Sequence, residues 1–203
     1  MTTGIHNETF KNLQLNAGAF LRDFDYTQYS TYADIKAAIA ELIETNDGTL
    51  MGLTQGGGTF RCEPNMRQIE GDGIRAAFVG GTVNDGWTVK LTGTLKEITP
   101  GNFKDALISA DKETTGSVTK LTIRTAINDE DYIPSMCWVG DTARGFMLIA
   151  LENVLNTVGA TFTFTDKGEG TVPFEFQAHH KDATNQDVAP CAVLFLDEEE
   201  AGE

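Results

Sequence analysis

Alternating apolar and polar residues predict a β-hairpin between residues 159 and 182. In residues 160–165 two phenylalanines alternate with small or hydroxyl residues, and residues 172–178 alternate in the same way. The sequence DKGEG between them carries two glycines, which tolerate the positive φ angles of a turn. One face of the hairpin is therefore expected to be buried. That face would carry Phe162, Phe164, Val172, Phe174, Phe176 and Ala178, and Thr161, Thr163 and Thr165 would lie on the polar face.

Two adjacent histidines, His179 and His180, end this hairpin. Neighbouring residues of a strand point to opposite faces, whereas zinc ligands must all lie about 2.0–2.1 Å from one ion. The third histidine, His6, lies far away in the sequence. We therefore expect a solvated His179, a His180 at the end of the strand, and no metal or cofactor.

Helical spacing of apolar residues predicts one main α-helix over residues 32–44. Thr31 and Asp34 have the spacing of a capping box at its start. A second, shorter helix is predicted over residues 102–110, after the sequence TPG. The stripe of the main helix is Ile35, Ala38, Ile39, Leu42 and Ile43, a pattern typical of a helix face packed on a core.

Other alternating runs predict that the rest of the core consists of strands. Residues 73–79 and 86–98 are expected to pair around the turn sequence NDG, and Pro64 is typical of an edge strand. The pattern favours a mainly β fold in one domain spanning residues 1–203. Further strands are expected within residues 117–126, 135–141, 145–154 and 191–196. Within the 86–98 strand, Trp87, Val89, Leu91 and Leu95 alternate with the polar Thr88, Lys90, Thr92 and Thr94.

Three segments break the alternation. Residues 1–30 are interpreted as an extended N-terminal arm, and residues 197–203, with the sequence DEEEAGE, as a solvated acidic tail. Residues 47–58 are interpreted as a long glycine-rich loop, which lacks the GK[ST] of a phosphate-binding loop. This loop places the apolar Leu50, Met51 and Leu53 before Gly56, Gly57 and Gly58.

The charge balance excludes functions that require a tight grip on phosphates. The chain has 15 Lys and Arg against 30 Asp and Glu, a formal net charge of -15, whereas nucleic-acid binding needs an excess of positive charge. Its 40% hydrophobic and 22% charged residues are ordinary for a soluble globular protein. The apolar run FMLIAL is too short to span a membrane. We therefore expect a cytoplasmic protein with no membrane partner.

The search for catalytic chemistry finds no established motif. Cys62, Cys137 and Cys191 stand apart without CxxC spacing, which favours reduced thiols over a disulfide framework or a zinc site. The chain has no GxSxG or GxGxxG motif in the required context. The acidic sequence DEDY lacks the spacing of a calcium loop, and a glycosidase-type pair of carboxylates has no support in the pattern. We therefore expect no enzymatic activity.

Four segments together resemble the tail tube proteins of tailed bacteriophages and related prophages. They are LNAGAFLRDFDY at residues 15–26, TQGGGTFRCEPNMRQIEGDG at 54–73, WTVKLTGTLKEIT at 87–99 and DKGEGTVPFEFQAH at 166–179, with WVGD at 138–141 in addition. Their order and spacing span nearly the whole chain. The resemblance implies a β-sandwich or open barrel flanked by a helix, which closes into hexameric rings that stack as a hollow tube for genome passage.

This resemblance also implies a set of partners. The chain would assemble with copies of itself and with tail initiator or baseplate, tape measure and terminator proteins, in the host cytoplasm, and would end in the virion tail. Phage DNA would pass through without specific binding. Leu50, Met51 and Leu53 would be buried by the neighbouring ring, and a polar, negatively charged inner wall would come from Thr88, Lys90, Thr92 and Thr94 or from Thr161, Thr163 and Thr165.

Two questions stay open at this level. The sequence does not separate a contractile tail from a non-contractile one, and secretion-system tubes share the fold that the resemblance implies. The alternative from another functional class is a carbohydrate-binding β-sandwich module. A row of aromatic side chains on an exposed polar face would favour that alternative, whereas the identifiable Phe and Trp residues are expected on apolar faces.

Overall fold

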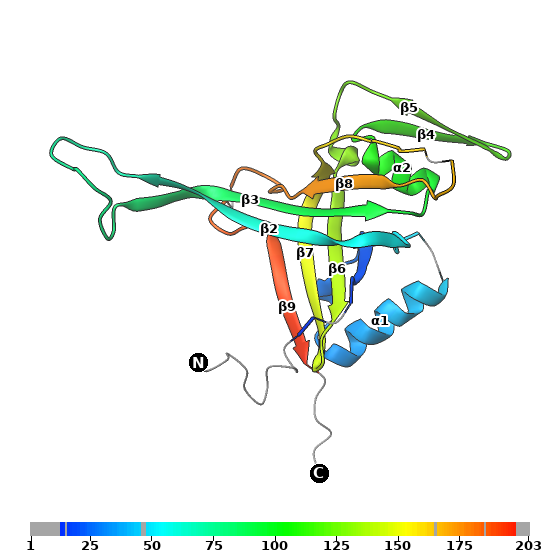
Figure 1. Ribbon diagram of the computed structural model, residues 1–203, viewed down its shortest axis with the longest axis horizontal. Coiled ribbons are helices and arrows are strands. Elements are labelled where there is room, and N and C mark those ends of the chain that lie inside the picture. The colour runs from blue at the N-terminus through cyan, green and yellow to red at the C-terminus, as the bar shows by residue number, and fades with distance from the viewer. Residues whose placement is uncertain (1–12, 15, 46–47, 165, 185, 198–203) are drawn as a thin grey trace, which may run out of the picture.

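The computed structural model describes residues 13–14, 16–45, 48–164, 166–184 and 186–197 (Figure 1). Its fold is mainly β with two α-helices, as predicted. Most of the predicted acidic tail and the first twelve residues of the predicted N-terminal arm lie outside the described residues. The strands are β1 (Ala19–Arg22), β2 (Thr54–Gln68), β3 (Thr82–Leu95), β4 (Ala110–Thr115), β5 (Val118–Ile123), β6 (Ile133–Asp141), β7 (Gly145–Asn156), β8 (Val172–Gln177) and β9 (Cys191–Asp197).

The main strands form two antiparallel layers that pack face to face. The first layer has the order β1-β6-β7-β9, and the second has the order β2-β3-β8. The layers are joined because the last residues of β7, Leu155 and Asn156, pair with β8. On the opposite side, the backbone of Met51 donates a hydrogen bond of 3.0 Å to Phe20 O of β1. This arrangement confirms the predicted sandwich.

The interior between the layers is filled by side chains that the alternating pattern assigned to one face. Val89, Leu91 and Leu95 of β3 are all buried, as predicted, although Trp87 at the start of that series is 38% exposed. The apolar face of β8 is buried as well. The resulting core cluster contains Phe20, Met51, Val89, Leu91, Leu95, Met136, Ile149, Leu151, Val154, Phe174, Phe176 and Ala178.

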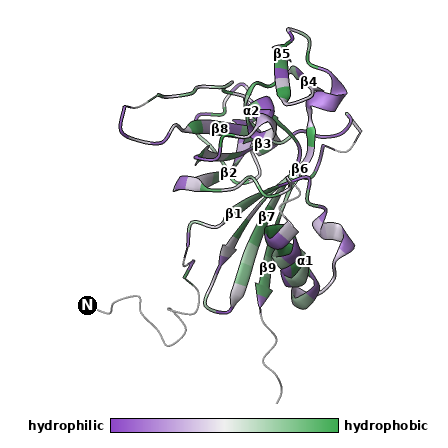
Figure 2. Ribbon diagram, turned by 90° about the vertical axis from the view of Figure 1, so that its right-hand side faces the viewer, coloured by the Kyte–Doolittle hydropathy of each residue, from purple (hydrophilic) through white to green (hydrophobic). Residues whose placement is uncertain are grey.

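A second cluster lies between the first layer and α1 (Tyr32–Thr45), the main helix of the prediction. Figure 2 shows this helix beside β7 and β9. Its start is fixed by Thr31, whose Oγ1 accepts a hydrogen bond of 3.2 Å from Asp34 N, as expected for a capping residue. Ile35 is fully packed, with 1% exposure, whereas Ile43 is 55% exposed and lies at the edge of the stripe.

The second helix, α2, spans Pro100–Ala106 rather than the predicted residues 102–110. It starts earlier because Thr99 caps it, accepting a hydrogen bond from Asn102 N at 3.1 Å, and because proline suits the first position of a helix. It ends earlier because residue 110 already begins β4. Strands β4 and β5 form a separate two-stranded sheet beside α2.

The expectation that residues 1–30 form an arm outside the core is wrong for residues 19–24. Phe20 and Leu21 of β1 are both 0% exposed, and β1 pairs with β6 from Ala19 to Arg22. Phe20 contacts Phe174 edge-on, with 5.1 Å between ring centroids. The segment was misread because its apolar run is short and has a kink at Gly18, which has a φ of 71°.

Two predicted hairpins are also wrong, because their strands do not pair with each other. Residues 160–164 form no strand, and among the described residues of the two runs the isolated bridge between Thr163 and Thr171 is the one β-pairing that joins them. Strand β8 pairs instead with β3, from Val172 to Gln177. Residues 73–79 are likewise outside any strand, and the NDG sequence lies within β3 because β2 and β3 continue past it to pair Gln68 with Thr82.

Candidate self-assembly surfaces

A long β-hairpin projects from the sandwich, and it is the most unusual feature of the molecule (Figure 1). Strand β3 pairs with β8 only from Lys90 to Leu95. From Val89 back to Thr82, β3 pairs with β2 alone among the described strands, and Thr82 lies opposite Gln68. We call residues 63–88 the projecting hairpin. Residues 63–80 of this segment are exposed, whereas Gly81 is buried and residues 83, 86 and 88 of β3 are partly buried.

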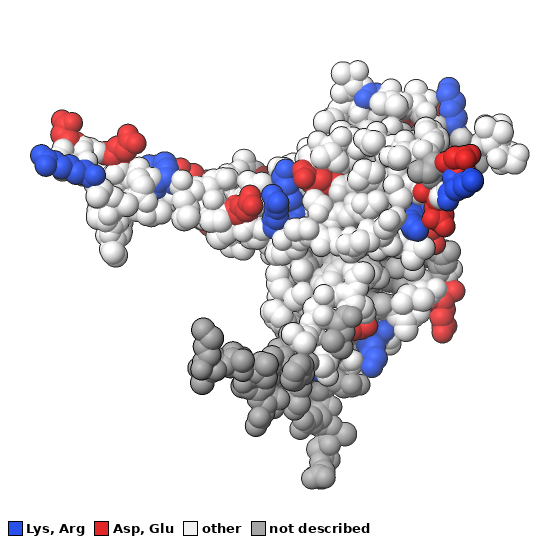
Figure 3. Space-filling view, in the orientation of Figure 1, with Lys and Arg blue, Asp and Glu red and all other residues white. Residues whose placement is uncertain are grey.

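The projecting hairpin ends in a cluster of apolar side chains that contact solvent. Residues 63–80 are all exposed. Both charge signs gather near this end, as Figure 3 shows. The exposed apolar side chains of the tip are Ile69 at 43%, Ile74 at 44%, Phe78 at 49% and Val79 at 104%. An apolar end on a two-stranded ribbon is typical of a surface that is covered by another molecule.

Glycines shape the tip of the projecting hairpin. Gly73 and Gly80 have φ angles of 90° and 89°, a region that disfavours other residues. The backbone of Ile69 donates to Gly81 O at 2.8 Å, and Gly81 N donates to Phe78 O at 3.0 Å, so the base of the tip is closed. The alternation in residues 73–79 predicts a strand, which the structure does not contain. The glycines at both ends of that run were the signal for a tip.

The predicted stacking loop at residues 47–58 is wrong in conformation. Gly56, Gly57 and Gly58 lie in β2. Gly56 and Gly57, with φ angles of 76° and 72°, lie where the pairing register with β3 shifts. Gly58 is needed for space, because a Cβ atom there would lie 2.8 Å from Phe20 Cζ and 2.4 Å from Thr92 O. The glycines therefore form a bulge and a packing contact rather than a loop.

The three apolar residues before these glycines have different environments. Met51 is 0% exposed and belongs to the core between the layers, so it is not available to a neighbouring ring. Leu50 packs against the second cluster and bridges to Leu21. Leu53 alone is largely exposed, at 62%. The projecting hairpin, and not residues 50–53, carries the main exposed apolar surface of this region.

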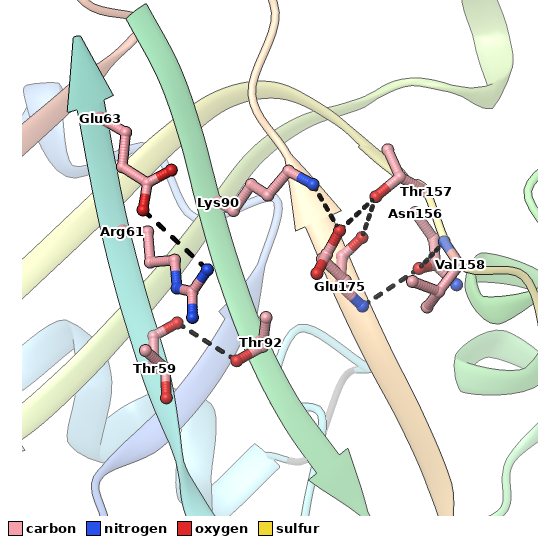
Figure 4. A network of polar contacts seen from close by, with 9 residues as sticks. All are labelled: Thr59, Arg61, Glu63, Lys90, Thr92, Asn156, Thr157, Val158 and Glu175. Atoms are coloured by element: carbon pink, nitrogen blue, oxygen red, sulfur yellow. Dashed lines mark hydrogen bonds and ion pairs between the residues drawn. The ribbon is translucent and has the colours of Figure 1, made fainter.

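The polar residues predicted on β3 lie together on the outer face of the second layer. Lys90 Nζ donates to Glu175 Oε1 of β8 at 2.6 Å, and Thr157 Oγ1 donates to the same atom at 2.9 Å (Figure 4). Thr92 Oγ1 donates to Thr59 O of β2 at 3.4 Å. Thr88 and Thr94 occupy the same face by alternation.

The charges on this face are balanced rather than acidic. Arg61 lies opposite Lys90 across β2 and β3, and Glu63 and Glu175 supply two carboxylates beside them. The hydrogen bond and charge of Lys90 hold the pKa of Glu175 below its ordinary value. Two basic and two acidic side chains therefore balance in this patch, and the negative net potential of an assembled inner wall stays a prediction. A neutral polar face still lacks the excess of positive charge that duplex binding requires.

The other predicted lining residues do not share a face with this patch. Thr161 and Thr163 are exposed and lie outside any named strand, and Thr165 lies outside the described residues. Phe162 packs edge-on against Phe103 of α2, with 6.2 Å between centroids. Phe164 is 83% exposed, so the two rings do not form the predicted buried face.

The histidine pair has its own local contacts. His179 Nδ1 lies 3.2 Å from Asn153 O, and the ring packs edge-on against Tyr132 with 5.2 Å between centroids. His180 is partly buried. Among the described residues, no group of three or more His, Cys, Asp or Glu side chains is arranged to hold a metal ion. The expectation that this pair binds no metal stays a prediction.

Exposed aromatic side chains bear on the carbohydrate-binding alternative. Phe195 of β9 is 75% exposed and lines a groove with Tyr32 and Lys36 of α1. Phe78 lies at the tip of the projecting hairpin, and Phe164 lies in the loop before β8. These rings come from separate elements, so they do not form the row along one polar face that this alternative predicts.

Comparison with known proteins gives no assignment. No protein family matches the chain, and no curated protein matches it significantly. Within the part of the chain that the structure describes, none of the helices has both the length and the apolar character needed to cross a bilayer.

Proposed function

We propose that this chain is a structural subunit that polymerises into a tube, and specifically a tail tube protein of a tailed bacteriophage or prophage. The observation that carries this proposal is the projecting hairpin. It extends from the sandwich, no third strand of the described chain pairs with it, and it ends in exposed Ile69, Ile74, Phe78 and Val79. A two-stranded ribbon is at best marginally stable alone. Docking on another subunit would bury its end.

A projecting element that docks on a different surface of the next copy makes a heterologous contact. Such contacts produce closed rings or open filaments, depending on whether the rotation closes. Burying apolar area contributes about 25 cal/mol per Å², less the cost of association. Stacked hexameric rings, as the sequence resemblance implies, combine both outcomes: the subunits of one ring form a closed ring, and the stacked rings form an open filament. The polar and charge-balanced outer face of β3 and β8 suits a channel past which DNA moves without adhering.

The test compares three purified proteins by sedimentation velocity and negative-stain microscopy across a salt series. One is the wild type, one carries Ile74→Ser and Val79→Ser at the tip, and one carries Ile127→Ser and Val188→Ser as a matched control. The control side chains are 51% and 65% exposed and lie in loops of the body. Circular dichroism checks that all three are folded.

We expect rings or tubes from the wild type and the control, and monomers or single rings from the tip variant. Raising the salt concentration should promote assembly, because like-charged subunits repel over a Debye length of about 8 Å at physiological salt. A wild type that stays monomeric across the whole series would contradict the proposed function. Equal assembly by the tip variant would contradict the role of the hairpin while leaving tube formation intact.

A further inference from the structure

Two cysteines from distant parts of the sequence lie at the same edge of the sandwich. Cys62 lies on β2, the edge strand of the second layer, opposite the buried Val89 of β3. Cys191 begins β9, the edge strand of the first layer, opposite the buried Leu151 of β7. Residues directly opposite in an antiparallel pair share a face. Both thiols therefore point between the layers.

The two thiols are neighbours. Both side chains are partly buried and pack against the same core cluster. Burial, followed by the effect of the nearby Cys62 thiol, raises the pKa of Cys191 to about 11. At neutral pH Cys191 is therefore mainly a protonated thiol.

The third cysteine provides an internal contrast. Cys137 is 0% exposed and lies on the other side of the first layer, in the cluster under α1. Its Sγ donates to Phe24 O at 3.6 Å. Burial raises the pKa of this thiol to about 12. Cys137 has no neighbouring cysteine in the same cluster.

We propose that Cys62 and Cys191 are an oxidative modification site, at which a two-electron thiol oxidant of the peroxide class joins the two layers by a disulfide. The two thiols lose two hydrogen atoms and form one S–S bond, while hydrogen peroxide takes up the two electrons and two protons and becomes two molecules of water. Each cysteine belongs to a strand paired on one side only at that position. A strand paired on one side only is held by fewer backbone hydrogen bonds than a central strand, and a disulfide requires Cα atoms about 4.4–6.8 Å apart.

The cross-link would have a mechanical consequence. It joins positions 62 and 191 and so closes a long loop, which restricts the unfolded chain. It also fixes the base of the projecting hairpin to β9, because Cys62 lies immediately before that hairpin. The proposal stands apart from tube formation, since it depends only on the fold of one subunit.

The experiment oxidises the folded wild-type protein with hydrogen peroxide after removal of reductant. Peptide mapping by mass spectrometry should find a Cys62–Cys191 peptide lighter by two hydrogens, and thiol titration after unfolding should fall from three free thiols to one. The melting temperature should rise by roughly 5–10 °C over that of the reduced protein. Cys62→Ser and Cys191→Ser should each abolish the linkage and the rise, whereas Cys137→Ser should retain both.

Three results would overturn the proposal. They are an unchanged thiol count after oxidation, a linkage that involves Cys137, and a linkage found only between two chains on a non-reducing gel. If a serine variant fails to fold, the peptide map of the oxidised wild type alone shows whether Cys62 and Cys191 are linked.

Discussion

Two ion pairs show how differently the sandwich and the projecting hairpin hold their side chains. In the sandwich, Arg22 Nε lies 2.6 Å from Asp105 Oδ2, and the side chains are only 20% and 11% exposed. In the hairpin, Arg67 Nε lies 2.6 Å from Asp85 Oδ2, but the side chains are 59% and 46% exposed. The N–O distance is the same in the two pairs, but the exposed fraction of the side chains differs. Interaction energy therefore depends on what surrounds the pair.

The apolar residues follow the same division. Phe20 is fixed by contacts with both layers, whereas Phe78 lies over Gly81 at the tip and faces solvent on its other side. We expect the apolar side chains of the sandwich to contribute strongly to the free energy of unfolding. Those at the tip should contribute little to it. The tip therefore lies outside the packed core.

The largest expected effect separates these two phenylalanines. Phe20→Ala should lower the free energy of unfolding by about 3–5 kcal/mol, because it removes a ring packed between the layers and leaves a cavity. Phe78→Ala should change it by no more than about 0.5 kcal/mol, because the ring is 49% exposed. Urea denaturation followed by circular dichroism measures both. Similar losses from the two variants would show that the tip is part of the folding core.

The second prediction concerns the buried ion pair. Burial raises the pKa of Asp105 to about 6 although Arg22 acts in the opposite direction. A carboxyl whose pKa is higher in the folded state binds its proton more tightly there, so it adds stability as pH falls from about 7 towards 4. Relative to Asp105→Asn, the wild type should gain on the order of 2–3 kcal/mol over that range.

The matched control for this prediction is Asp85→Asn on the projecting hairpin. Its pair with Arg67 is exposed, so we expect a change of about 0–1 kcal/mol. Unfolding free energies of all three proteins at a series of pH values give the comparison. If the wild type and Asp105→Asn follow parallel pH profiles, Asp105 is not held in a strongly desolvated site.

The sequence predicted the elements whose period is long and uninterrupted. The stripe of α1 and the alternation of Val89, Leu91 and Leu95 are visible in the sequence because one face of each element packs against the core. The alternation in residues 160–165 was equally clear but misleading. The predicted pairing did not form because β8 pairs instead with β3 from Val172 to Gln177, and β3 is distant from it in the sequence.

Glycine-rich segments were the main source of error at the candidate surfaces. Gly58 and Gly93 are opposite each other on β2 and β3 and leave room for Phe20. A packing role of this kind depends on a side chain from β1 and has no local signal. The projecting hairpin was missed for a related reason, since its strands are exposed on both faces and show no regular alternation. The Cys62 and Cys191 neighbourhood depends on the packing of two layers and likewise has no local signal.

The smallest expected effect lies at the base of the projecting hairpin, where β3 leaves β8. Glu175 accepts hydrogen bonds from Lys90 and Thr157, which lower its pKa from 4.5. Such a carboxylate adds stability above its unfolded pKa and loses this contribution as pH falls through its folded pKa. Glu175→Gln should therefore cost about 0.2–1 kcal/mol at pH 7, because the pair is about a quarter exposed and screened, and nearly nothing at pH 3. This slope is opposite to that of Asp105. Glu63→Gln is the control, since its pair with Arg61 is 3.9 Å long and well exposed, and it should leave the unfolding free energy unchanged. A cost for Glu175→Gln that persists at pH 3 would show that the side chain acts through packing rather than through its charge.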